Sequence, residues 1–265
     1  MSRVEQVFAK GKALIPFITA GDPDLETTEK LVLAMARAGA DLIELGIPFS
    51  DPVAEGPVIQ LASERALQAG ATTDKILALV SRVRTESDVP LAFMTYINPV
   101  FAYGIDRFMQ DSREAGVDAL IIPDLPFEER EEIIPYCSQY GIELISMIAP
   151  TSRERIRMIA REARGFVYCV SSLGVTGVRE QISTEPENMV AMVKAVQDIP
   201  CAVGFGISSP EQAQQISQTA DGVIVGSAIM QIVEQFGVES VSPVAAFVRE
   251  MKQSIITAGV EEPVQ

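Results

Sequence analysis

Three acidic side chains gather in a short proline-rich stretch near the start of the chain. Glu44 ends an apolar run of strand type, and Asp51 and Glu55 follow in a segment whose prolines exclude both a central strand and a helix interior. A carboxylate in a covered strand either faces a polar cavity or carries a large desolvation cost. Because such carboxylates cluster at functional sites, we expect Glu44 to donate or accept a proton. A solvated, inert acid is the alternative.

The residue types that are missing narrow the chemistry further. The chain has no histidine, which excludes Ser-His and Cys-His nucleophile pairs, histidine bases and histidine metal ligands. Its three cysteines, Cys137, Cys169 and Cys201, are too scattered for a disulfide framework or a metal knuckle. Acid–base work is therefore left to carboxylates, tyrosine, lysine or cysteine, and we expect no metal.

Charge and hydropathy exclude two classes of partner. The formal net charge is −15, which argues against a nucleic-acid-binding surface. It does not argue against a phosphorylated small molecule, because backbone N–H groups at helix N-termini can hold a phosphate. No apolar run is long enough to span a membrane, and the first residues lack the apolar core of a signal peptide, so we expect a cytoplasmic protein.

The chain alternates between strand-type runs and amphipathic helical windows. Eight such runs are recognised: 13–19, 41–45, 90–96, 118–123, 142–148, 165–170, 201–205 and 221–225. Eight strand-then-helix units predict an α/β fold, a single (β/α)8 TIM-barrel domain over residues 1–265, with an open doubly wound sheet as the alternative. We expect extra helices at both ends, one within residues 1–11 and two within 228–257, the latter separated by Gly237 and Ser242-Pro243.

Short motifs mark where these units begin. Capping boxes are predicted at Thr151 to Glu154, Thr184 to Glu187 and Ser209 to Gln212. The sequences Ala38-Gly39-Ala40-Asp41 and Ala115-Gly116-Val117-Asp118 each end a helix with glycine and begin a strand, and Ala220-Asp221 repeats this less fully.

Glycine-rich turns follow the last three predicted strands. In a barrel the site lies at the C-terminal ends of the strands, where Gly204-Phe205-Gly206 and Gly226-Ser227 would let the backbone approach a phosphate. Two ordinary turns are the alternative. The longer connection 171–181, with glycines at 174 and 177, predicts a lid over the site, against the alternative of a surface loop without that role.

These motifs together resemble a known family. The run ELGIPFSDP from Glu44 to Pro52, preceded by PFITAGDP from Pro16 to Pro23, closely resembles the α subunit of tryptophan synthase. The glycine-containing motifs at 174–177, 204–208 and 226–228 match in order and spacing, so the resemblance covers essentially the whole chain. It implies a (β/α)8 barrel that cleaves indole-3-glycerol phosphate to indole and glyceraldehyde 3-phosphate and needs no cofactor.

The resemblance also implies roles for individual residues. Glu44 stands where the family has the glutamate that protonates indole C3 and takes the glycerol hydroxyl proton. Glu55 stands where the family has an aspartate that accepts a hydrogen bond from the indole N–H, so this chain departs by one methylene. Tyr168 matches a tyrosine that orients the acidic pair.

Further positions fall into three implied groups. The indole pocket is expected at Phe17, Met94, Tyr96, Ile121 and Ile148, the phosphate site at Gly177, Phe205, Gly206, Gly226 and Ser227, and the lid at Gly174 and Thr176. Ser172 and Leu173 stand where some relatives have an arginine and a serine, which implies a weaker lid.

The resemblance finally implies a partner. The family docks on a pyridoxal-phosphate-dependent β subunit, as an α2β2 complex, and Pro52, Asn98 and Phe101 correspond to its docking surface. Two other readings stay open. One is another phosphate-binding barrel of the same pathway, such as indole-glycerol-phosphate synthase or a phosphoribosyl isomerase. The other is a regulatory subunit with little activity of its own, for which the departure at Glu55 is the argument.

Overall fold

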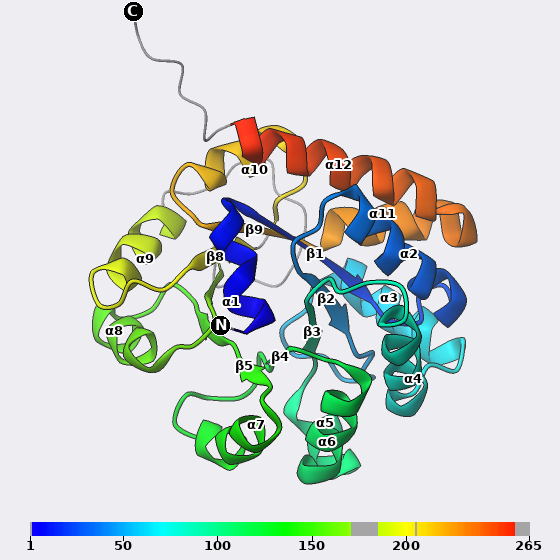
Figure 1. The fold of residues 1–265 in the computed structure, drawn as a ribbon, viewed down its shortest axis with the longest axis horizontal. Coiled ribbons are helices and arrows are strands. Elements are labelled where there is room, and N and C mark those ends of the chain that lie inside the picture. The colour runs from blue at the N-terminus through cyan, green and yellow to red at the C-terminus, as the bar shows by residue number, and fades with distance from the viewer. Residues whose placement is uncertain (1, 171–184, 205, 258–265) are drawn as a thin grey trace, which may run out of the picture.

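The computed structural model describes residues 2–170, 185–204 and 206–257. Its strands are all parallel and form one sheet in the order β5-β4-β3-β2-β1-β9-β8-β7-β6 (Figure 1). They are β1 (Ala13–Thr19), β2 (Ile43–Gly46), β3 (Leu91–Met94), β4 (Ala119–Ile121), β5 (Glu143–Leu144), β6 (Ser146–Ile148), β7 (Val167–Val170), β8 (Cys201–Gly204) and β9 (Gly222–Val225). The two strands at the ends of this order are consecutive in sequence, so the sheet curls into a nearly closed barrel. The predicted barrel is confirmed, and the open sheet is wrong.

The predicted strand 142–148 differs from the observed structure. Its first half, β5, pairs with β4, and the Ile145 N–H still donates to the Leu120 carbonyl at 2.9 Å. From Ser146 onward the chain pairs with β7 instead, opposite Val167. One strand-type run therefore pairs with two different strands, β4 before Ile145 and β7 after it. This change of partner joins the two ends of the sheet.

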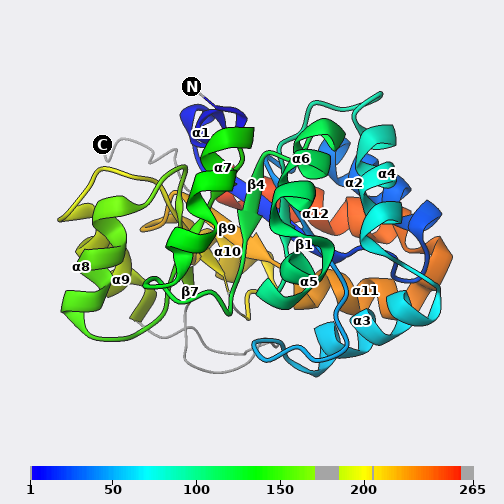
Figure 2. The ribbon, with the colours of Figure 1, turned by 90° about the horizontal axis from the view of Figure 1, so that it is seen from below.

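Helices cover the outside of the barrel (Figures 1 and 2). The described ranges contain α1 (Arg3–Val7), α2 (Leu25–Ala38), α3 (Pro57–Gln68), α4 (Thr73–Val83), α5 (Ile97–Tyr103), α6 (Ile105–Ala115), α7 (Ile134–Tyr140), α8 (Arg153–Glu162), α9 (Glu185–Lys194), α10 (Pro210–Ser217), α11 (Ser227–Phe236) and α12 (Val241–Thr257). Short 3-10 turns lie at Phe8–Lys10, Arg130–Glu132 and Gly237–Glu239. None of the helices in these ranges is long and apolar enough to cross a membrane.

The predicted extra helices are present at both ends. Helix α1 lies across the N-terminal end of the barrel, where Val4 is fully buried among the inward side chains and the Phe8 ring lies 5.4 Å from that of Phe166 (Figure 2). Near the C-terminus, α11 ends at Gly237 as expected. Pro243 does not separate helices but lies in the first turn of α12, where a missing N–H is tolerated.

The observed helix N-caps agree with the predicted ones except that one cap is displaced by one residue. Helix α8 is capped by Ser152, whose hydroxyl accepts the Arg155 N–H at 3.3 Å, so the predicted cap at Thr151 is wrong by one residue. Ser209 caps α10 as predicted, although the Gln212 side chain reaches back to the N–H of Ser208. The predicted cap Thr184 lies outside the described residues.

The aspartates of the repeated sequence motif share one structural role at the N-terminal end of the barrel. Each accepts an N–H from the first residues of a neighbouring strand and pairs with a lysine or arginine on a helix or its terminus. Asp41 binds Leu14 N–H (2.7 Å) and Lys252 (2.7 Å), Asp118 binds Leu91 N–H (3.0 Å) and Arg84 (2.7 Å), and Asp221 binds Cys201 N–H (2.8 Å) and Lys194 (2.9 Å). These carboxylates tie strands to the outer layer.

Candidate active site

Glu44 is a fully buried acid in the wall of the barrel. Strand β2 places it beside Phe17 of β1 and Ala92 of β3, on the face that also carries the inward Leu42. Its exposed fraction is 0%, and neither carboxylate oxygen has a hydrogen-bond partner among the described residues. Burial without a compensating donor raises the pKa of Glu44 from its ordinary value of 4.5 to about 8. The group is therefore protonated at neutral pH and can act as a proton donor.

Glu55 is the second acid with an altered pKa. It lies in the loop between β2 and α3, half-buried, and its Oε2 has no partner among the described residues. Burial raises the pKa of Glu55 to about 7, and a hydrogen bond from the Tyr96 phenol opposes this rise. Two carboxyl groups with pKa values near neutrality therefore belong to β2 and the loop that follows it, which suits acid–base chemistry.

Tyr168 lies inside the barrel on β7. It is 5% exposed, and burial followed by the charge of Glu44 raises the pKa of its phenol well above the usual range. Gly204 on β8 leaves the space that this side chain occupies, because a Cβ there would lie 2.6 Å from the Tyr168 Oη. The phenol is thus a neutral hydrogen-bonding group close enough to Glu44 for a charge there to raise its pKa.

Phe17 depends on two glycines at neighbouring strand ends. A Cβ on Gly46 would lie 2.6 Å from Phe17 Cζ, and one on Gly226 would lie 3.2 Å from Phe17 Cδ1. The ring therefore fills the space above these glycines, beside Glu44. Its contact with both β2 and β9 places an apolar wall between the acid and the glycine-rich turn after β9.

A cavity of about 540 Å³ opens at the C-terminal end of the barrel. Of the residues to which the sequence assigns a role, Glu55, Met94 and Tyr168 line it, together with other residues that include Pro123, Asp124, Ser146, Met147 and Ala149. Tyr96 and Ile121 are buried near it, at 3% and 0% exposure. The lining is mostly apolar with a few ionisable groups, which is typical of a site for an aromatic ligand.

The structure corrects one pocket residue. Met147 pairs with Tyr168 across β6 and β7 and packs with the inward side chains, whereas Ile148 points the other way, into the layer under the helices. The prediction of Ile148 as a pocket residue is therefore wrong, and Met147 holds that position. The register of β6 opposite Tyr168, which only the structure shows, identifies it.

Two glycines of the predicted phosphate site lie just after β8 and β9. Gly206 has a φ of +80°, and Gly226 precedes α11, whose first turn begins at Ser227 and has no side-chain cap. Free N–H groups at this ten-residue helix can therefore face an anion. The predicted phosphate residues Gly177 and Phe205 and the predicted lid residues Gly174 and Thr176 lie outside the described residues.

The predicted docking residues lie on the surface beside the site. Asn98 and Phe101 on α5 are exposed, Phe101 by 45%, and Pro52 is half-buried next to Val53, which is 73% exposed. Over the ranges that the structure describes, no three histidine, cysteine, aspartate or glutamate side chains gather as a metal site would require.

Known proteins resemble this chain over nearly its full length. The family model for the tryptophan synthase alpha chain matches residues 5–256. The alpha chain of Thermoanaerobacter sp. (strain X514) is 48% identical over 260 residues, which cover 96% of this chain and 99% of that protein. The alpha chain of Geobacter sulfurreducens is 49% identical over 262 residues, covering 96% and 99%.

Solved structures give the same result. The alpha chain of Legionella pneumophila subsp. pneumophila is 38% identical, with a TM-score of 0.89 and coverage of 98% of this chain and 100% of that one. A chain of the tryptophan synthase complex from Pyrococcus furiosus is 35% identical, with a TM-score of 0.84 and coverage of 92% and 99%. The parallel barrel, the buried Glu44 on β2 and these relatives agree: the chain belongs to the tryptophan synthase alpha chain family.

Proposed function

We propose that Glu44 and Glu55 together carry out the lyase reaction of this family, the cleavage of indole-3-glycerol phosphate to indole and glyceraldehyde 3-phosphate in tryptophan biosynthesis. The observation that carries this proposal is the Glu44 carboxyl group, which is fully buried and has no partner among the described side chains. Its pKa of about 8 keeps a proton available at neutral pH. An acid with only a structural role would be paired, as the aspartates at the other end of the barrel are.

Glu44 donates one proton and regains another. The protonated carboxyl group donates to indole C3, which places positive charge on the ring. The resulting carboxylate then takes the proton of the glycerol hydroxyl while the bond from C3 to the glycerol carbon breaks. Its electron pair restores the aromatic indole, the hydroxyl carbon becomes the aldehyde, and Glu44 ends protonated as it began.

Glu55 stabilises the charge that develops on the indole ring. Its carboxylate accepts a hydrogen bond from the indole N–H, which becomes more acidic once C3 is protonated. A glutamate reaches one methylene farther than the aspartate expected from the family. Glu55 fits this role because it lines the cavity from a loop, where the chain can adjust, and because its pKa of about 7 allows ionisation.

The phosphate group fits the N-terminus of α11. Gly226 and Ser227 follow β9, and in the sheet only β1 separates β9 from the strand that carries Glu44. A substrate bound there would reach from this backbone site to the acid past the Phe17 ring. Helix-end N–H groups suit a dianion in a protein whose net charge is −15.

We also propose a β-subunit partner in an α2β2 assembly. Relatives of this chain have been solved as parts of tryptophan synthase complexes, including that of Pyrococcus furiosus. The exposed apolar side chains Val53 and Phe101 flank the site and give such a partner a contact surface, with Pro52 and Asn98 beside them. We further propose that residues 1–265 form one domain, since a single sheet takes strands from Ala13 to Val225.

Indole release from indole-3-glycerol phosphate tests the proposal. We expect slow release by the purified chain, a large acceleration by a cognate β subunit, and severe loss in a Glu55→Gln variant. Glu55→Asp serves as the matched control and should keep substantial activity. If the chain released no indole either alone or with the β subunit, and yet still stimulated the reaction of the β subunit, the chain would be a regulatory subunit. If Glu55→Asp raised release by orders of magnitude, the role given to Glu55 would be wrong.

A further inference from the structure

A single tyrosine holds the loop that carries Glu55. Between Phe49 and Glu55 the chain has neither helix nor strand. Tyr96, at the end of β3, contacts this segment in three ways: its ring lies 5.5 Å from that of Phe49, its Oη accepts the Ala54 N–H at 3.0 Å, and its hydroxyl hydrogen-bonds Glu55. The side chain is 3% exposed, so these contacts are made out of water.

The backbone next to Tyr96 is hydrogen-bonded to a residue that follows the neighbouring strand β4. Tyr96 is the residue before α5, and the first N–H of that helix, from Ile97, donates to Asp124 Oδ1 at 2.9 Å. Asp124 follows β4 and lines the same cavity as Glu55. The loop after β2, the end of β3 and the end of β4 are thus joined through Tyr96 and its neighbour Ile97.

From these contacts we infer that Tyr96 is a positioning residue, which holds Glu55 in its ionised form and correct orientation, in addition to any contact with the indole ring. The inference rests on the proposed role of Glu55. The Tyr96 hydroxyl accepts from Ala54 and therefore has its proton free to donate to the Glu55 carboxylate. A donor held in this way favours the charged form of an acid that burial disfavours.

Other ionisable groups near Glu55 do not replace this donor. Asp124, Arg130, Arg155 and Tyr168 line the same cavity. The pKa of Glu55 responds to burial, which raises it, and then to the Tyr96 hydrogen bond, which lowers it. Arg155 is engaged with Glu128 through two hydrogen bonds of 2.7 and 3.0 Å, and Arg130 pairs with Glu162.

The test is a Tyr96→Phe variant, which keeps the ring against Phe49 and removes only the hydroxyl. The pKa of Glu55 should rise by about one unit, because a hydrogen bond to a charged group is lost. The acid limb of the kcat/KM profile for indole-3-glycerol phosphate should move to higher pH by the same amount. The ionised fraction of Glu55 at pH 7, and with it the activity, should fall about fivefold and recover toward pH 8. A carboxyl-carbon NMR titration, assigned with Glu55→Gln, gives the pKa without turnover.

Two further variants keep the inference falsifiable. Tyr140→Phe is the matched control, because it removes a phenol that donates to Asp106 at 2.9 Å on the surface, and it should leave the pH profile unchanged. In a Glu55→Gln background, Tyr96→Phe should add little further loss. A loss of the same size with and without the Glu55 carboxylate, or an unshifted Glu55 titration, would overturn the inference. Near-normal turnover in Glu55→Gln itself would instead overturn the proposed function.

Discussion

Two groups of carboxylates, which lie at opposite ends of the barrel, have opposite surroundings. At the N-terminal end, Asp41, Asp118 and Asp221 each bind a backbone N–H and a cation. At the C-terminal end, Glu44 has no partner among the described residues and Glu55 has one unpartnered oxygen. The three aspartates each have a donor and a cation beside them, whereas burial raises the pKa values of Glu44 and Glu55. Pairing gives stability, whereas the lack of pairing leaves a proton available for chemistry.

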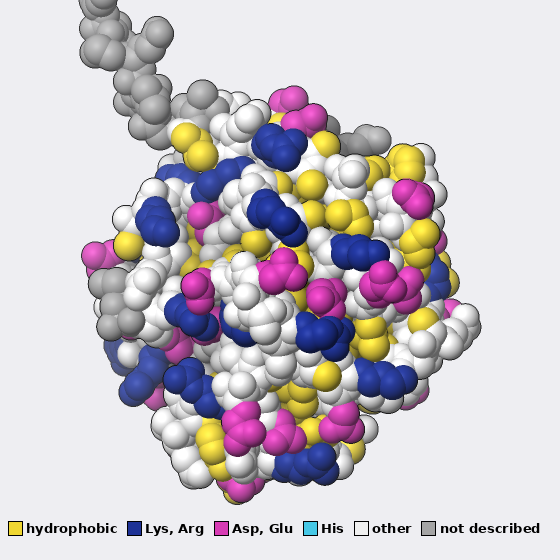
Figure 3. Space-filling view, turned by 45° about the vertical axis from the view of Figure 1, so that its right-hand side comes forward, with side chains coloured by type: hydrophobic (Ala, Val, Ile, Leu, Met, Phe, Trp, Pro, Cys, Tyr) yellow, Lys and Arg dark blue, Asp and Glu magenta, His cyan; other side chains and the backbone are white. Residues whose placement is uncertain are grey.

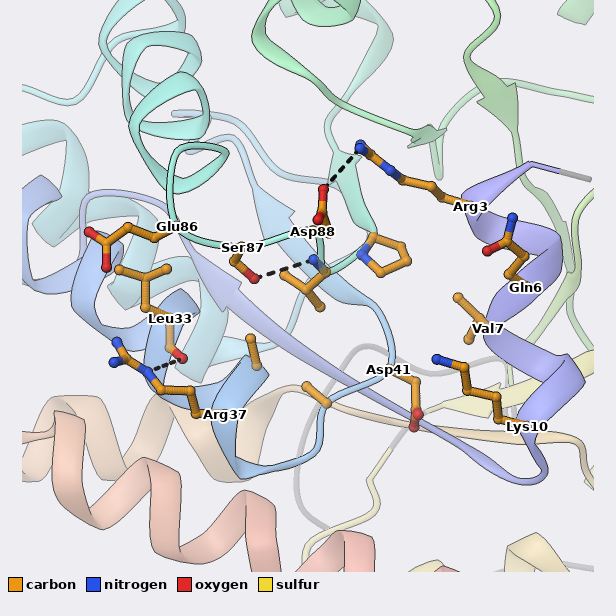
Figure 4. A pocket seen from close by; sticks show the side chains of 14 residues that line it. Arg3, Gln6, Val7, Lys10, Leu33, Arg37, Asp41, Glu86, Ser87 and Asp88 are labelled. Atoms are coloured by element: carbon orange, nitrogen blue, oxygen red, sulfur yellow. Dashed lines mark hydrogen bonds and ion pairs between the residues drawn. The ribbon is translucent and has the colours of Figure 1, made fainter.

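The surroundings of the N-terminal end fit its structural role. A surface hollow of about 560 Å³ lies there between α1, α2 and the connection after α4, and Figure 4 shows both charge signs around it, with Arg3 paired to Asp88. Figure 3 shows lysine and arginine side chains interspersed with acids over the face seen there. Opposite charges that face each other in this way are already compensated and gain little by binding a small ion.

The largest effect should follow from removing the proton at the C-terminal end. Glu44→Gln keeps the shape of the side chain but cannot transfer a proton, and we expect indole release to fall by about two to four powers of ten. The measurement is single-turnover cleavage of indole-3-glycerol phosphate with saturating β subunit. Asp41→Asn is the matched neutralisation at the other end and should leave turnover per folded molecule close to normal. Equal losses in the two variants would contradict the comparison.

Removing a paired aspartate at the N-terminal end of the barrel should cause a large loss of stability. Asp118→Ala leaves Arg84, which is only 12% exposed, without its main partner and also frees the Leu91 N–H. We expect the free energy of unfolding to fall by about 3 kcal/mol. Denaturant unfolding measures this, and Asp88→Ala, at an exposed carboxylate that pairs with Arg3, is the control expected to change stability by less than about 1 kcal/mol.

The pH dependence of stability should separate the two kinds of carboxylate. The pKa of Glu44 is raised from 4.5 to about 8 on folding, so the folded protein binds more protons than the unfolded chain between these values. Stability is therefore complete below about pH 4.5 for this group and declines as pH rises toward 8. The loss is on the order of a few kcal/mol. Unfolding titrations from pH 5 to 8.5 should show this decline flattened in Glu44→Gln; an unchanged slope would contradict the assigned pKa.

The smallest effect concerns the space beside Glu44. Gly46→Ala places a methyl group against the Phe17 ring and should destabilise the protein by about 1–3 kcal/mol and weaken substrate binding. The double variant Gly46→Ala with Phe17→Leu should recover part of the stability, since the shorter side chain leaves room. Thermal unfolding and KM for the substrate measure the two effects. Additive losses would show that the ring and the glycine do not compete for the same space.

Sequence patterns predicted the barrel and its principal acid because both leave local signals. Strand-type runs that alternate with amphipathic helices fix the fold class, and a carboxylate near the C-terminal end of the run 41–45 marks Glu44. The position of Ile148 could not be read in this way. Apart from Glu143 and Ser146 the run 142–148 is apolar, and no local pattern reveals the change of strand partner at Ile145 or shows which of Met147 and Ile148 points inward.

The contacts between Tyr96 and the loop that carries Glu55 could not be predicted from the sequence, for a different reason. Tyr96 and Ala54 are 42 residues apart, and their contact depends on how the end of β3 aligns with the loop after β2. The three aspartates show the intermediate case. Their repeated motif could be recognised in the sequence. Its structural role, to accept an N–H from the start of a neighbouring strand, became clear only from the structure.

The change of partner at Ile145 has a consequence for how the ring is held closed. At every other boundary in the barrel, two strands meet along a ladder of hydrogen bonds, and such a ladder can in principle slip by two residues and re-form. Between β5 and β6 the neighbours are instead consecutive pieces of one chain, joined by the peptide bonds of Ile145. One continuous run therefore completes the ring, pairing with β4 through β5 and with β7 through β6, so a shift of register on one side of Ile145 would be carried to the other side.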